Sequence, residues 1–366
     1  MEIIRVFTPN DVEQVANLFQ KVFRNNTSPA SESLKSYFRE LYFEHPWYRD
    51  DLPSLVYESS NNKILGFLGV LPLHMNFNGK SILAGVGGNY MVDPSLKNPL
   101  AGPRILKKFL SGPQKLSMSD TGNEIGRKMW EGLGGTISPL QSLHWIRPLR
   151  PAHLALYVAQ EKAPVLKFAG LLTRPISYIL DSISTTLSSS PLHLESPTGY
   201  IKEITTQEIL DSIQTASVKR ILTPAYTEKS LQWILQKACE KQEFGSLRSM
   251  GVYTSKHSLM GWFLYYPNSG KIGQVLQVGT KSQTISNVLD HLFQDALEMK
   301  SLALIGRMDS VFMKEFSAKL CLLFHRSNYF MMHAKEVEIL HAINSCEAYI
   351  TRLEGEWWTR LQGDIF

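Results

Sequence analysis

Short runs rich in apolar residues, bounded by turn residues, mark four segments in the first half of the chain as strands: residues 3–7, 54–59, 63–75 and 80–92. Asn78-Gly79 lies between the last two segments and is a strong turn signal. We therefore expect these two strands to form an antiparallel hairpin.

Apolar residues recur at helical spacing in other segments. Residues 10–24 and 31–43 each carry such a face, so two helices are expected between the first two strands. The elements expected after the hairpin are a helix from Pro103, a strand over 115–119, a helix that begins near Asn123 and a strand over 136–147 that closes the sheet.

The second half repeats this order of elements without repeating the residues. Helices are expected over 228–241, 282–299 and 313–320, and strands over 247–255, 259–266, 270–278, 302–307 and 329–333. Repetition of this kind predicts an α/β (α+β) chain with two tandem domains, each a mixed, mostly antiparallel sheet flanked by helices. The predicted domains are 1–150 and 199–366, joined by a helical, Pro- and Ser-rich linker over 151–198 with a helix at 163–184.

Composition narrows the class of protein. The chain has 366 residues, of which 43% are hydrophobic and 19% charged, so it can bury two cores. A net charge of +5 without a basic stripe does not indicate a nucleic-acid partner. Three scattered cysteines and unpaired histidines give no reason to expect a disulfide or a metal site. No apolar run could span a membrane and the N-terminus lacks the features of a signal peptide, so a cytoplasmic location is expected.

Residues 89–110 combine a strand, a loop and a helix start. The strand breaks at Asp93-Pro94, and Pro103 falls in the first turn of the helix, where its missing N–H costs nothing. The N–H groups of that turn and the helix dipole favour an anion. We therefore expect a diphosphate to bind at this helix start.

This stretch resembles motif A of the GNAT acyltransferases, which bind acyl-coenzyme A. In that motif a strand leads through V-x-P and R/Q-x-x-G-x-G/A into a helix. Val92 and Pro94 lie near the V-x-P position but shifted, while Lys97 and Gly102 match the basic and the final small positions. Leu100 stands where the middle glycine belongs, and its Cβ is expected to crowd a diphosphate.

A second stretch resembles motif B of the same family, N-x-x-A-x-x-L-Y-x-x-x-G-F. Asn123, Gly126, Met129, Trp130 and Gly134 fall in register with it. In the family this helix packs beside the pantetheine arm, and the tyrosine often acts as general acid to the leaving thiolate. Trp130 stands at that position, and an indole N–H cannot take that role at neutral pH. Over the first 150 residues, the chain is also similar to a group of bacterial tandem GNAT proteins of unassigned substrate.

The resemblance implies two tandem GNAT-like domains, of which the second is degenerate. It implies an acyl-coenzyme A-dependent N-acyltransferase, foremost an N-acetyltransferase, that uses acetyl-coenzyme A or another acyl-coenzyme A. The acceptor would be a small-molecule amine or amino sugar that attacks directly. The residues expected to hold the coenzyme are Met91, Val92, Lys97, Asn98, Leu100, Ala101, Gly102, Arg104, Asn123 and Trp130.

Three residues are candidates for catalysis. Asn89 follows two glycines in a strand, where a bulge is expected; in the family such a bulge offers a backbone N–H to the thioester carbonyl, although the glycines could merely ease a kink. Asp120 would face the acyl site, or else cap the following helix. Glu58, at the end of a central strand, is a candidate base, although a glutamate in that place is usually only solvated.

Other interpretations stay open. Leu100, Trp130 and the eroded second half would suit a GNAT scaffold that has lost catalysis and binds a ligand or partner. A tRNA-dependent aminoacyl transferase is a further alternative, which the modest net charge disfavours. Residues 352–358, RLEGEWW, are interpreted as a packing tail whose tryptophans could instead line a cleft.

Overall fold

The structure is a computed structural model that describes residues 2–163, 181, 193–215, 220–280, 284–326 and 328–366. The chain divides into two compact units. Unit 1 contains Met1–Ser142, Arg220–Lys237 and Ser327–Phe366, and unit 2 contains Leu143–Lys219 and Ala238–Arg326. Each unit therefore takes residues from both halves of the sequence.

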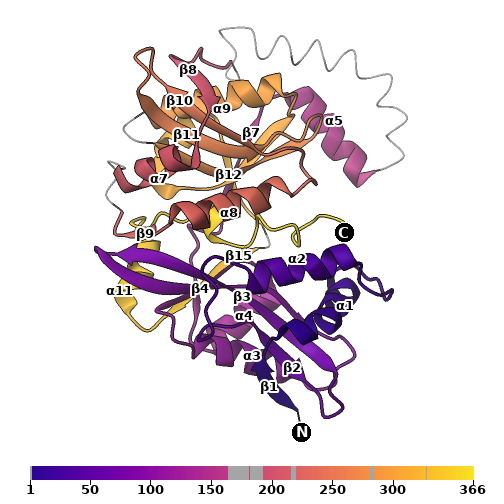
Figure 1. Cartoon of the computed structure of the whole chain (residues 1–366). Helices are drawn as coiled ribbons and strands as arrows, with labels where there is room; N and C mark the ends of the chain where they lie inside the picture. Colours follow the sequence, from indigo (N-terminus) through magenta and orange to yellow (C-terminus); the bar gives the residue numbers. More distant parts are fainter. Residues whose placement is uncertain (1, 164–180, 182–192, 216–219, 281–283, 327) are drawn as a thin grey trace. The chain divides into compact units, whose positions relative to one another are not determined.

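Unit 1 is built on a mixed sheet with the strand order β1-β2-β3-β4-β5-β15-β6 (Figure 1). The strands are Ile3–Val6 (β1), Leu55–Glu58 (β2), Ile64–Phe77 (β3), Lys80–Val92 (β4), Leu116–Gly122 (β5), Thr136–Ile137 (β6) and Tyr329–Ala334 (β15), with Leu222–Pro224 (β9) paired to the end of β3. β4 and β5 are parallel, and the other neighbouring pairs are antiparallel. The hairpin expected from the Asn78-Gly79 turn is the β3–β4 pair.

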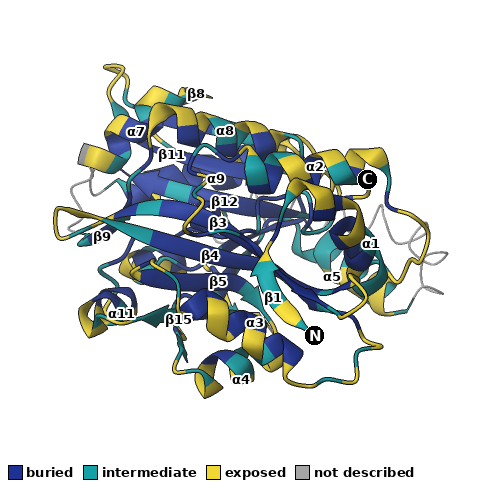
Figure 2. Ribbon diagram, turned by 60° about the horizontal axis from the view of Figure 1, so that its bottom comes forward, coloured by how far each residue is buried: buried dark blue, intermediate teal, exposed yellow. Residues whose placement is uncertain are grey.

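Helices cover both faces of this sheet. They are α1 (Val12–Phe23), α2 (Glu32–Phe43), α3 (Ala101–Leu110), α4 (Glu124–Gly132), α11 (Val337–Asn344) and the part of α8 (Glu228–Cys239) that belongs to unit 1. Each of α1 to α4 turns buried residues toward the sheet and exposed ones toward solvent, as Figure 2 shows for α1 and α3. The helical periodicity of residues 10–24 and 31–43 thus gave the right elements.

Strand β3 shows how the two faces are filled. Gly66 faces α3, whereas Phe67 and Gly69 face α2. A Cβ at Gly66 would lie 2.8 Å from Ile105 Cδ1, and one at Gly69 would overlap the hydroxyl of Tyr42. Glycine at these positions lets the helices pack closely against the strand.

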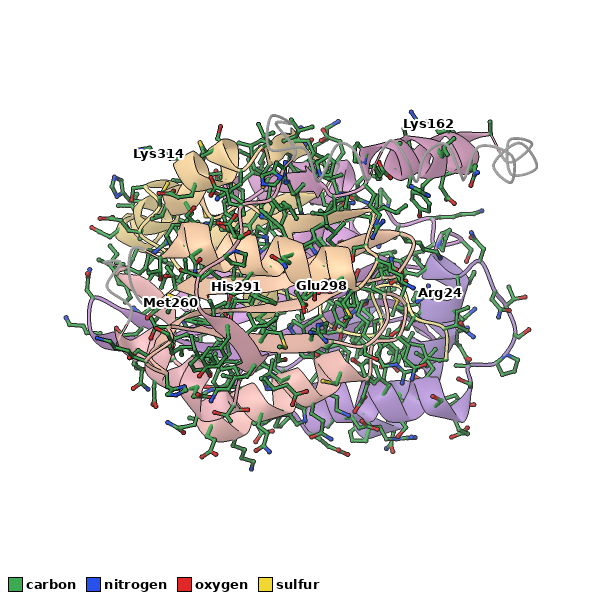
Figure 3. All side chains as sticks on the ribbon, turned by 90° about the horizontal axis from the view of Figure 1, so that it is seen from above. Arg24, Lys162, Met260, His291, Glu298 and Lys314 are labelled. Carbon is green, nitrogen blue, oxygen red and sulfur yellow. The ribbon has the colours of Figure 1, made fainter. Side chains whose placement is uncertain are left out.

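Unit 2 is built on a sheet with the strand order β8-β10-β11-β12-β13-β7-β14. The strands are Leu143–Pro148 (β7), Tyr200–Glu203 (β8), Arg248–Tyr253 (β10), Leu259–Tyr266 (β11), Ile272–Thr280 (β12), Ala303–Arg307 (β13) and Leu322–His325 (β14). Its helices are α5 (Pro151–Lys162), α7 (Thr206–Thr215), α9 (Ile285–Glu298) and α10 (Met313–Ala318), and short 3₁₀ turns lie at Pro9–Asp11, Ser310–Phe312 and Arg352–Glu354 along the chain. In Figure 3, α9 carries the labelled His291 and Glu298, and Met260 belongs to β11.

The two sheets have the same architecture position by position. In each, strands run from an edge (β1 or β8) to a long central hairpin (β3–β4 or β11–β12), and the hairpin is followed by the one parallel pair (β4–β5 or β12–β13). The expected fold class, two mixed sheets flanked by helices, is confirmed. The repeat is therefore one of topology, although the residues differ.

The sixth strand of each sheet comes from the other half of the sequence. β15, near the C-terminus, pairs with β5 and β6 in unit 1, whereas β7 pairs with β13 and β14 in unit 2. The single closing strand expected over 136–147 is therefore wrong: it is two strands, and only Thr136–Ile137 joins the first sheet. The expected domains, 1–150 and 199–366, differ from the observed division for the same reason, because local patterns do not record long-range pairing.

Other expectations differ in smaller ways. α3 begins at Ala101 rather than Pro103, and β9, β14 and α11 were not expected. The linker expected over 151–198 contains α5, while the helix expected over 163–184 lies outside the described residues apart from Ala163 and Asp181. Among the described residues, no helix is long and apolar enough to cross a membrane.

We expect unit 1 to need β15 in order to fold. A chain that ends at residue 326 lacks β15 and leaves β5 with an unpaired edge. Its amides at 116–119 should exchange hydrogen within minutes, whereas a control chain that ends at Gln362 keeps β15 and should protect them. Equal protection in the two chains, measured by hydrogen exchange and mass spectrometry, would contradict the exchange of strands.

Candidate functional site

The parallel strands β4 and β5 separate part-way along their length. They pair only over Ala84–Val86 and Leu116–Met118. Beyond this point β4 bulges, because its register with β3 shifts between Gly88 and Met91, and Asn89 adopts a positive φ of 47°. The bulge expected from the two glycines is confirmed, and it marks the place where the strands part.

A cleft of about 580 Å³ opens where the two strands part. Its lining comes from α1, β3, β4, the loop before α3, α3, β5, α4, β15 and the C-terminal segment, by which we mean residues 351–366. The lining residues are Val22, Phe23, Leu68, Gly87, Gly88, Asn89, Tyr90, Met91, Val92, Asp93, Pro94, Leu96, Asn98, Pro99, Gly102, Pro103, Leu106, Ser119, Thr121, Gly122, Asn123, Ile125, Gly126, Met129, Trp130, Met331, Glu356 and Gln362.

The start of α3 reaches this cleft through Gly102 and Pro103. Its backbone donors are partly used within the loop: Leu100 N–H donates to Asn98 Oδ1 at 3.0 Å, and Ala101 N–H donates to Asn98 O at 3.3 Å. Pro103 has no N–H, and Arg104 N–H begins the helical series at Leu100 O. In the described part of the chain, the amide of Gly102 is thus the donor of this turn that has no hydrogen-bond partner.

The residues expected to hold the coenzyme fall into two groups. Met91, Val92, Asn98, Gly102, Asn123 and Trp130 line the cleft. Lys97, Leu100, Ala101 and Arg104 do not; Leu100 is 62% exposed, and the guanidinium of Arg104 lies 5.8 Å from the centre of the Tyr57 ring. Leu100 therefore does not crowd the cleft, because its side chain points to solvent.

Helix α4 forms a wall of the cleft. Asn123 caps it, because its side chain accepts the N–H of Gly126 at 2.9 Å. Capping by Asp120, one of the two roles expected for this residue, is therefore wrong, since β5 continues to Gly122. Trp130 is buried and packs edge-on against Phe109, with the ring centres 6.3 Å apart.

Glu356, from the C-terminal segment, lies at the point of strand separation. One carboxylate oxygen accepts the backbone N–H of Asn89 at 2.9 Å and its side-chain amide at 3.1 Å, and the other accepts the hydroxyl of Thr121. The carboxylate therefore bridges β4 and β5. It is 2% exposed and lines the cleft, and a Cβ at Gly88 would overlap it.

The surroundings of Glu356 favour its neutral form. Burial, followed by the nearby charge of Asp120, raises the pKa of Glu356 to about 8 against the hydrogen bond from Thr121. Asp120 is itself buried beneath the cleft, where it accepts the backbone N–H of Glu356 at 3.0 Å. Asp120 therefore supports Glu356 and does not line the cleft.

The C-terminal segment is fixed to unit 1 along its length. Trp358 is buried against the Trp233 ring at 5.9 Å, and the N–H of Arg360 donates to the hydroxyl of Tyr37 at 3.0 Å. Arg24, labelled in Figure 3, donates to the carbonyl of Asp364 at 2.7 Å. Its interpretation as a packing tail is therefore incomplete, because this segment also carries a polar group into the cleft.

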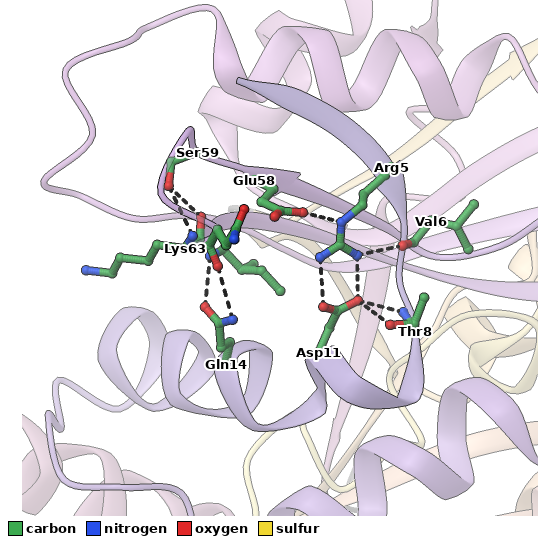
Figure 4. Close-up of polar contacts among 10 residues, drawn as sticks. Arg5, Val6, Thr8, Asp11, Gln14, Glu58, Ser59 and Lys63 are labelled. Carbon is green, nitrogen blue, oxygen red and sulfur yellow. Dashed lines mark hydrogen bonds and ion pairs between the residues drawn. The ribbon is translucent and has the colours of Figure 1, made fainter. Parts of the chain in front are cut away.

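The candidate base Glu58 lies elsewhere. Arg5 bridges Glu58 and Asp11, and its Nη1 donates to Asp11 Oδ2 at 2.7 Å (Figure 4). Glu58 is not among the residues of the cleft. Its role as a base is not supported by the structure, because Arg5 occupies it.

Asp93 is the other carboxylate that lines the cleft. Burial opposes its ionisation, but hydrogen bonds from Lys21 and Ser95 outweigh burial and lower the pKa of Asp93 to about 2. Its oxygens lie 2.7 and 2.8 Å from Lys21 Nζ. A carboxylate held in this way is ionised but a weak proton acceptor.

In unit 2, a side chain covers the part of β12 that corresponds to the bulged part of β4. A Cβ at Gly279 of β12 would overlap the ring of Trp262, which is buried and donates to Gln277 Oε1 at 2.9 Å. The ring thus covers this part of β12. Among the described residues, no group of three or more His, Cys, Asp or Glu side chains could hold a metal ion.

Comparison with protein-family models gives a match over the first part of unit 1. Residues 3–111 match the model of an acetyltransferase (GNAT) domain. This part of the chain is similar to a GNAT domain. The match contains α3 and the whole of β4, and the resemblance of the sequence to the GNAT superfamily is confirmed. No curated protein matches the chain.

Solved structures share the fold over both units. A probable N-acyltransferase from Enterococcus faecalis V583 matches with a TM-score of 0.61 and 11% identity, over 92% of this chain and 73% of that one. A GCN5-related N-acetyltransferase from Anabaena variabilis ATCC 29413 matches at 0.58 and 10%, over 92% and 74%. Saccharomyces cerevisiae N-myristoyltransferase with bound myristoyl-CoA matches at 0.53 and 11%, over 90% and 79%. At these identities the likeness shows the fold alone.

We expect Glu356 to make the stability of the protein fall as the pH rises. Between the ordinary pKa of 4.5 and about 8, folded Glu356 keeps a proton that the unfolded chain has released, so a rise in pH favours unfolding. The free energy of unfolding should fall by up to ~1.4 kcal/mol per pH unit more in the wild type than in Glu356→Gln. Urea denaturation at a series of pH values measures both slopes, and equal slopes would show that Glu356 has an ordinary pKa.

Proposed function

We propose that this chain transfers an acyl group from acyl-coenzyme A to an amine, by direct attack of the amine on the thioester. The observation that carries the proposal is the cleft between β4 and β5, which joins the start of a helix to a buried carboxylate. The helix start suits the phosphates of the donor, and the carboxylate suits the proton that the acceptor must lose. The GNAT domain match and the N-acetyltransferases among the structural neighbours support the same reaction class.

The donor side of the cleft offers contacts for a coenzyme A thioester. Its diphosphate would meet the amide of Gly102 and the dipole of α3. Lys97 and Arg104 do not line the cleft, but each is next in the sequence to a residue that does. Gly126 leaves room for a narrow arm beside α4, because a Cβ there would still be 3.6 Å from its nearest neighbours, whereas Met331 fills the space beside Gly122. The thioester would then reach the bulge at Asn89.

The role expected for Asn89 changes in this proposal. Its backbone N–H is expected from the sequence to stabilise the thioester oxygen, but in the structure this N–H holds Glu356 at 2.9 Å. Asn89 therefore acts as a positioning residue for the carboxylate. Acetyl transfer is the simplest form of the reaction, and a longer acyl group would extend along Leu68, Leu106 and Met331, which also line the cleft.

The alternatives gain little support from the geometry. Leu100, which suggested a scaffold without catalysis, points away from the cleft and so does not oppose donor binding. A tRNA substrate would need cations along its path, whereas none of the described residues lining the cleft is Lys, Arg or His.

Two substitutions on α4 test donor binding. Gly126 lies in the cleft wall, where a Cβ would be at least 3.6 Å from its neighbours, and Gly132 lies on the same helix with open space beside it. We expect Gly126→Trp to fill the cleft and weaken acyl-coenzyme A binding at least tenfold. Gly132→Trp places the same side chain on α4 but outside the cleft, so this variant should bind acyl-coenzyme A as tightly as the wild type does.

Calorimetry with acetyl-coenzyme A and with a longer acyl thioester measures both variants, and circular dichroism checks that each is folded. If the wild type gives no heat with either thioester, the proposed function is wrong. If Gly126→Trp and Gly132→Trp bind equally well, the donor lies outside this cleft.

A further inference from the structure

The exposed side of α3 (Figure 2) carries basic residues that no acidic residue balances. Residues 94–119 contain no Asp or Glu, but they contain Lys97, Arg104, Lys107, Lys108 and Lys115. Lys115 forms an ion pair with Glu336, whereas the other four are exposed and form no ion pair with another described residue. Arg104, Lys107 and Lys108 are three and four residues apart and share one side of the helix, which we call the basic face. The modest net charge of +5 does not record this local excess.

Helix α4, which also lines the cleft, has a different arrangement of charge. Its Arg127 forms ion pairs with Glu124 at 2.5 Å and Glu131 at 2.8 Å, and its Lys128 lies 3.7 Å from Glu124. Pairs at this spacing neutralise the surface of a helix. Helix α3 has no acidic residue that could do the same, so its positive charge is available to a partner.

The helix dipole explains only part of the charge on α3. Lys107 and Lys108 lie in the last turn, where a cation is favourable. Arg104 lies in the first turn, where a cation is unfavourable and where α3 has no acidic residue. A hydrogen bond from Tyr57 chiefly lowers the pKa of Glu2, and the charge of Arg104 adds to this effect without an ion pair between them. An anionic partner would account for cations at both ends of one helix.

The cleft itself lacks the cations that a nucleotide would attract. None of the described residues lining it is Lys, Arg or His. The basic face lies outside this lining, although Leu106, between two of its residues, belongs to the lining. Leu100 is 62% exposed and lies one turn before Arg104, because its carbonyl accepts the N–H of Arg104 at 3.0 Å. The positive charge therefore suits a donor that sends a narrow arm into the cleft and keeps its anionic part outside.

We propose that the basic face of α3 docks a small acidic carrier protein, which presents the acyl group on a phosphopantetheine arm that enters the cleft. The inference rests on the proposed function, because it keeps the thioester, the cleft and the reaction and changes what carries the arm. In coenzyme A the arm is attached to a nucleotide. On a carrier it is attached to a protein whose acidic side chains pair with Arg104, Lys107 and Lys108. Leu100 adds an apolar contact beside these charges.

The extent of the basic face favours a protein over other anionic partners. Helix α3 has 10 residues and is therefore about 15 Å long, which matches one short helix of a partner. A nucleic acid would need cations along a longer path. A membrane surface would need the apolar side of the helix, and on α3 that side, with Ile105 and Phe109, is buried in the core of unit 1.

The reaction balances as it does with coenzyme A. The nitrogen of the acceptor forms the new C–N bond, and the C–S bond between the acyl group and the arm breaks. The ammonium form of the acceptor loses two protons, of which one goes to the thiolate of the arm and the other to solvent. The products are an amide, the carrier with a free thiol and one proton, and no oxidant or reductant is needed.

The first test compares two donors on charge variants by calorimetry. The probes are a bacterial acyl carrier protein with an acetyl group on its arm, and acetyl-coenzyme A. We expect Lys107→Glu/Lys108→Glu to raise the Kd of the loaded carrier at least tenfold. The Kd of acetyl-coenzyme A should change less than twofold, because neither lysine lines the cleft.

A matched control separates the basic face from the total charge. Lys80→Glu/Lys335→Glu makes the same change in net charge at two exposed positions elsewhere in unit 1, and it should bind both donors as tightly as the wild type does. Lys107→Gln/Lys108→Gln removes the charge without reversing it and should give an intermediate Kd for the loaded carrier. Circular dichroism checks that every variant is folded.

The second test separates the docking surface from the arm. The same carrier without its arm keeps its acidic surface, so it should compete with fluorescently labelled loaded carrier in an anisotropy measurement. Its competition should weaken at least fivefold when NaCl is raised from about 50 to about 300 mM, because salt screens exposed charges. A carrier without the arm that fails to compete at the lower salt concentration would contradict docking on the basic face.

The outcomes separate this inference from the proposed function. If the wild type binds neither donor, both fail. Binding of acetyl-coenzyme A without binding of the loaded carrier would overturn the docking surface alone. Equal losses for the two donors in Lys107→Glu/Lys108→Glu would also overturn it and would assign the basic face to the phosphates of the coenzyme. Retention on tRNA or on phosphatidylglycerol vesicles, lost in that variant while the carrier does not bind, would assign the face to that partner instead.

Discussion

The site depends on one constraint, which is that backbone groups freed by the separation of two parallel strands must find other partners. β4 and β5 pair over three residues and then part at the bulge. The carboxylate of Glu356 binds the backbone amide of Asn89 on one strand and the hydroxyl of Thr121 on the other. The group that satisfies the parted strands is thus also the acid that lines the cleft, and a structural requirement and a chemical one meet in one side chain.

The two units have the same strand topology, but different groups occupy the space beyond the parallel pair of strands. Both sheets place a parallel pair after a long hairpin, and both complete their sixth position with a strand from the other half of the sequence. In unit 1 the space beyond the parallel pair is a cleft, whereas in unit 2 Trp262 covers the corresponding part of β12. Equal architecture therefore does not imply equal function, because the side chains at one strand decide whether a cavity remains.

Helices and strands that depend on nearby residues could be predicted from the sequence, whereas contacts between residues far apart in the sequence could not. β4 and β11 were expected with their observed bounds, because apolar runs and the turn residues that bound them are signals within a few positions. Asp120 was considered as a cap of α4 instead of Asn123, since the end of β5 depends on its pairing with β15. Glu356 was overlooked because it lies 267 residues from Asn89, in a segment that was interpreted through its tryptophans and not through its carboxylates.

The exchange of strands also has a consequence for the order in which the protein can be made. β15 and Glu356 both follow unit 2 in the sequence, so a ribosome adds them after every strand of that unit. The sheet of unit 1 remains incomplete at its β5 edge until all of unit 2 has been synthesised. A product terminated within unit 2 would lack both the strand and the acid, and the complete cleft can therefore exist only after translation has passed through unit 2.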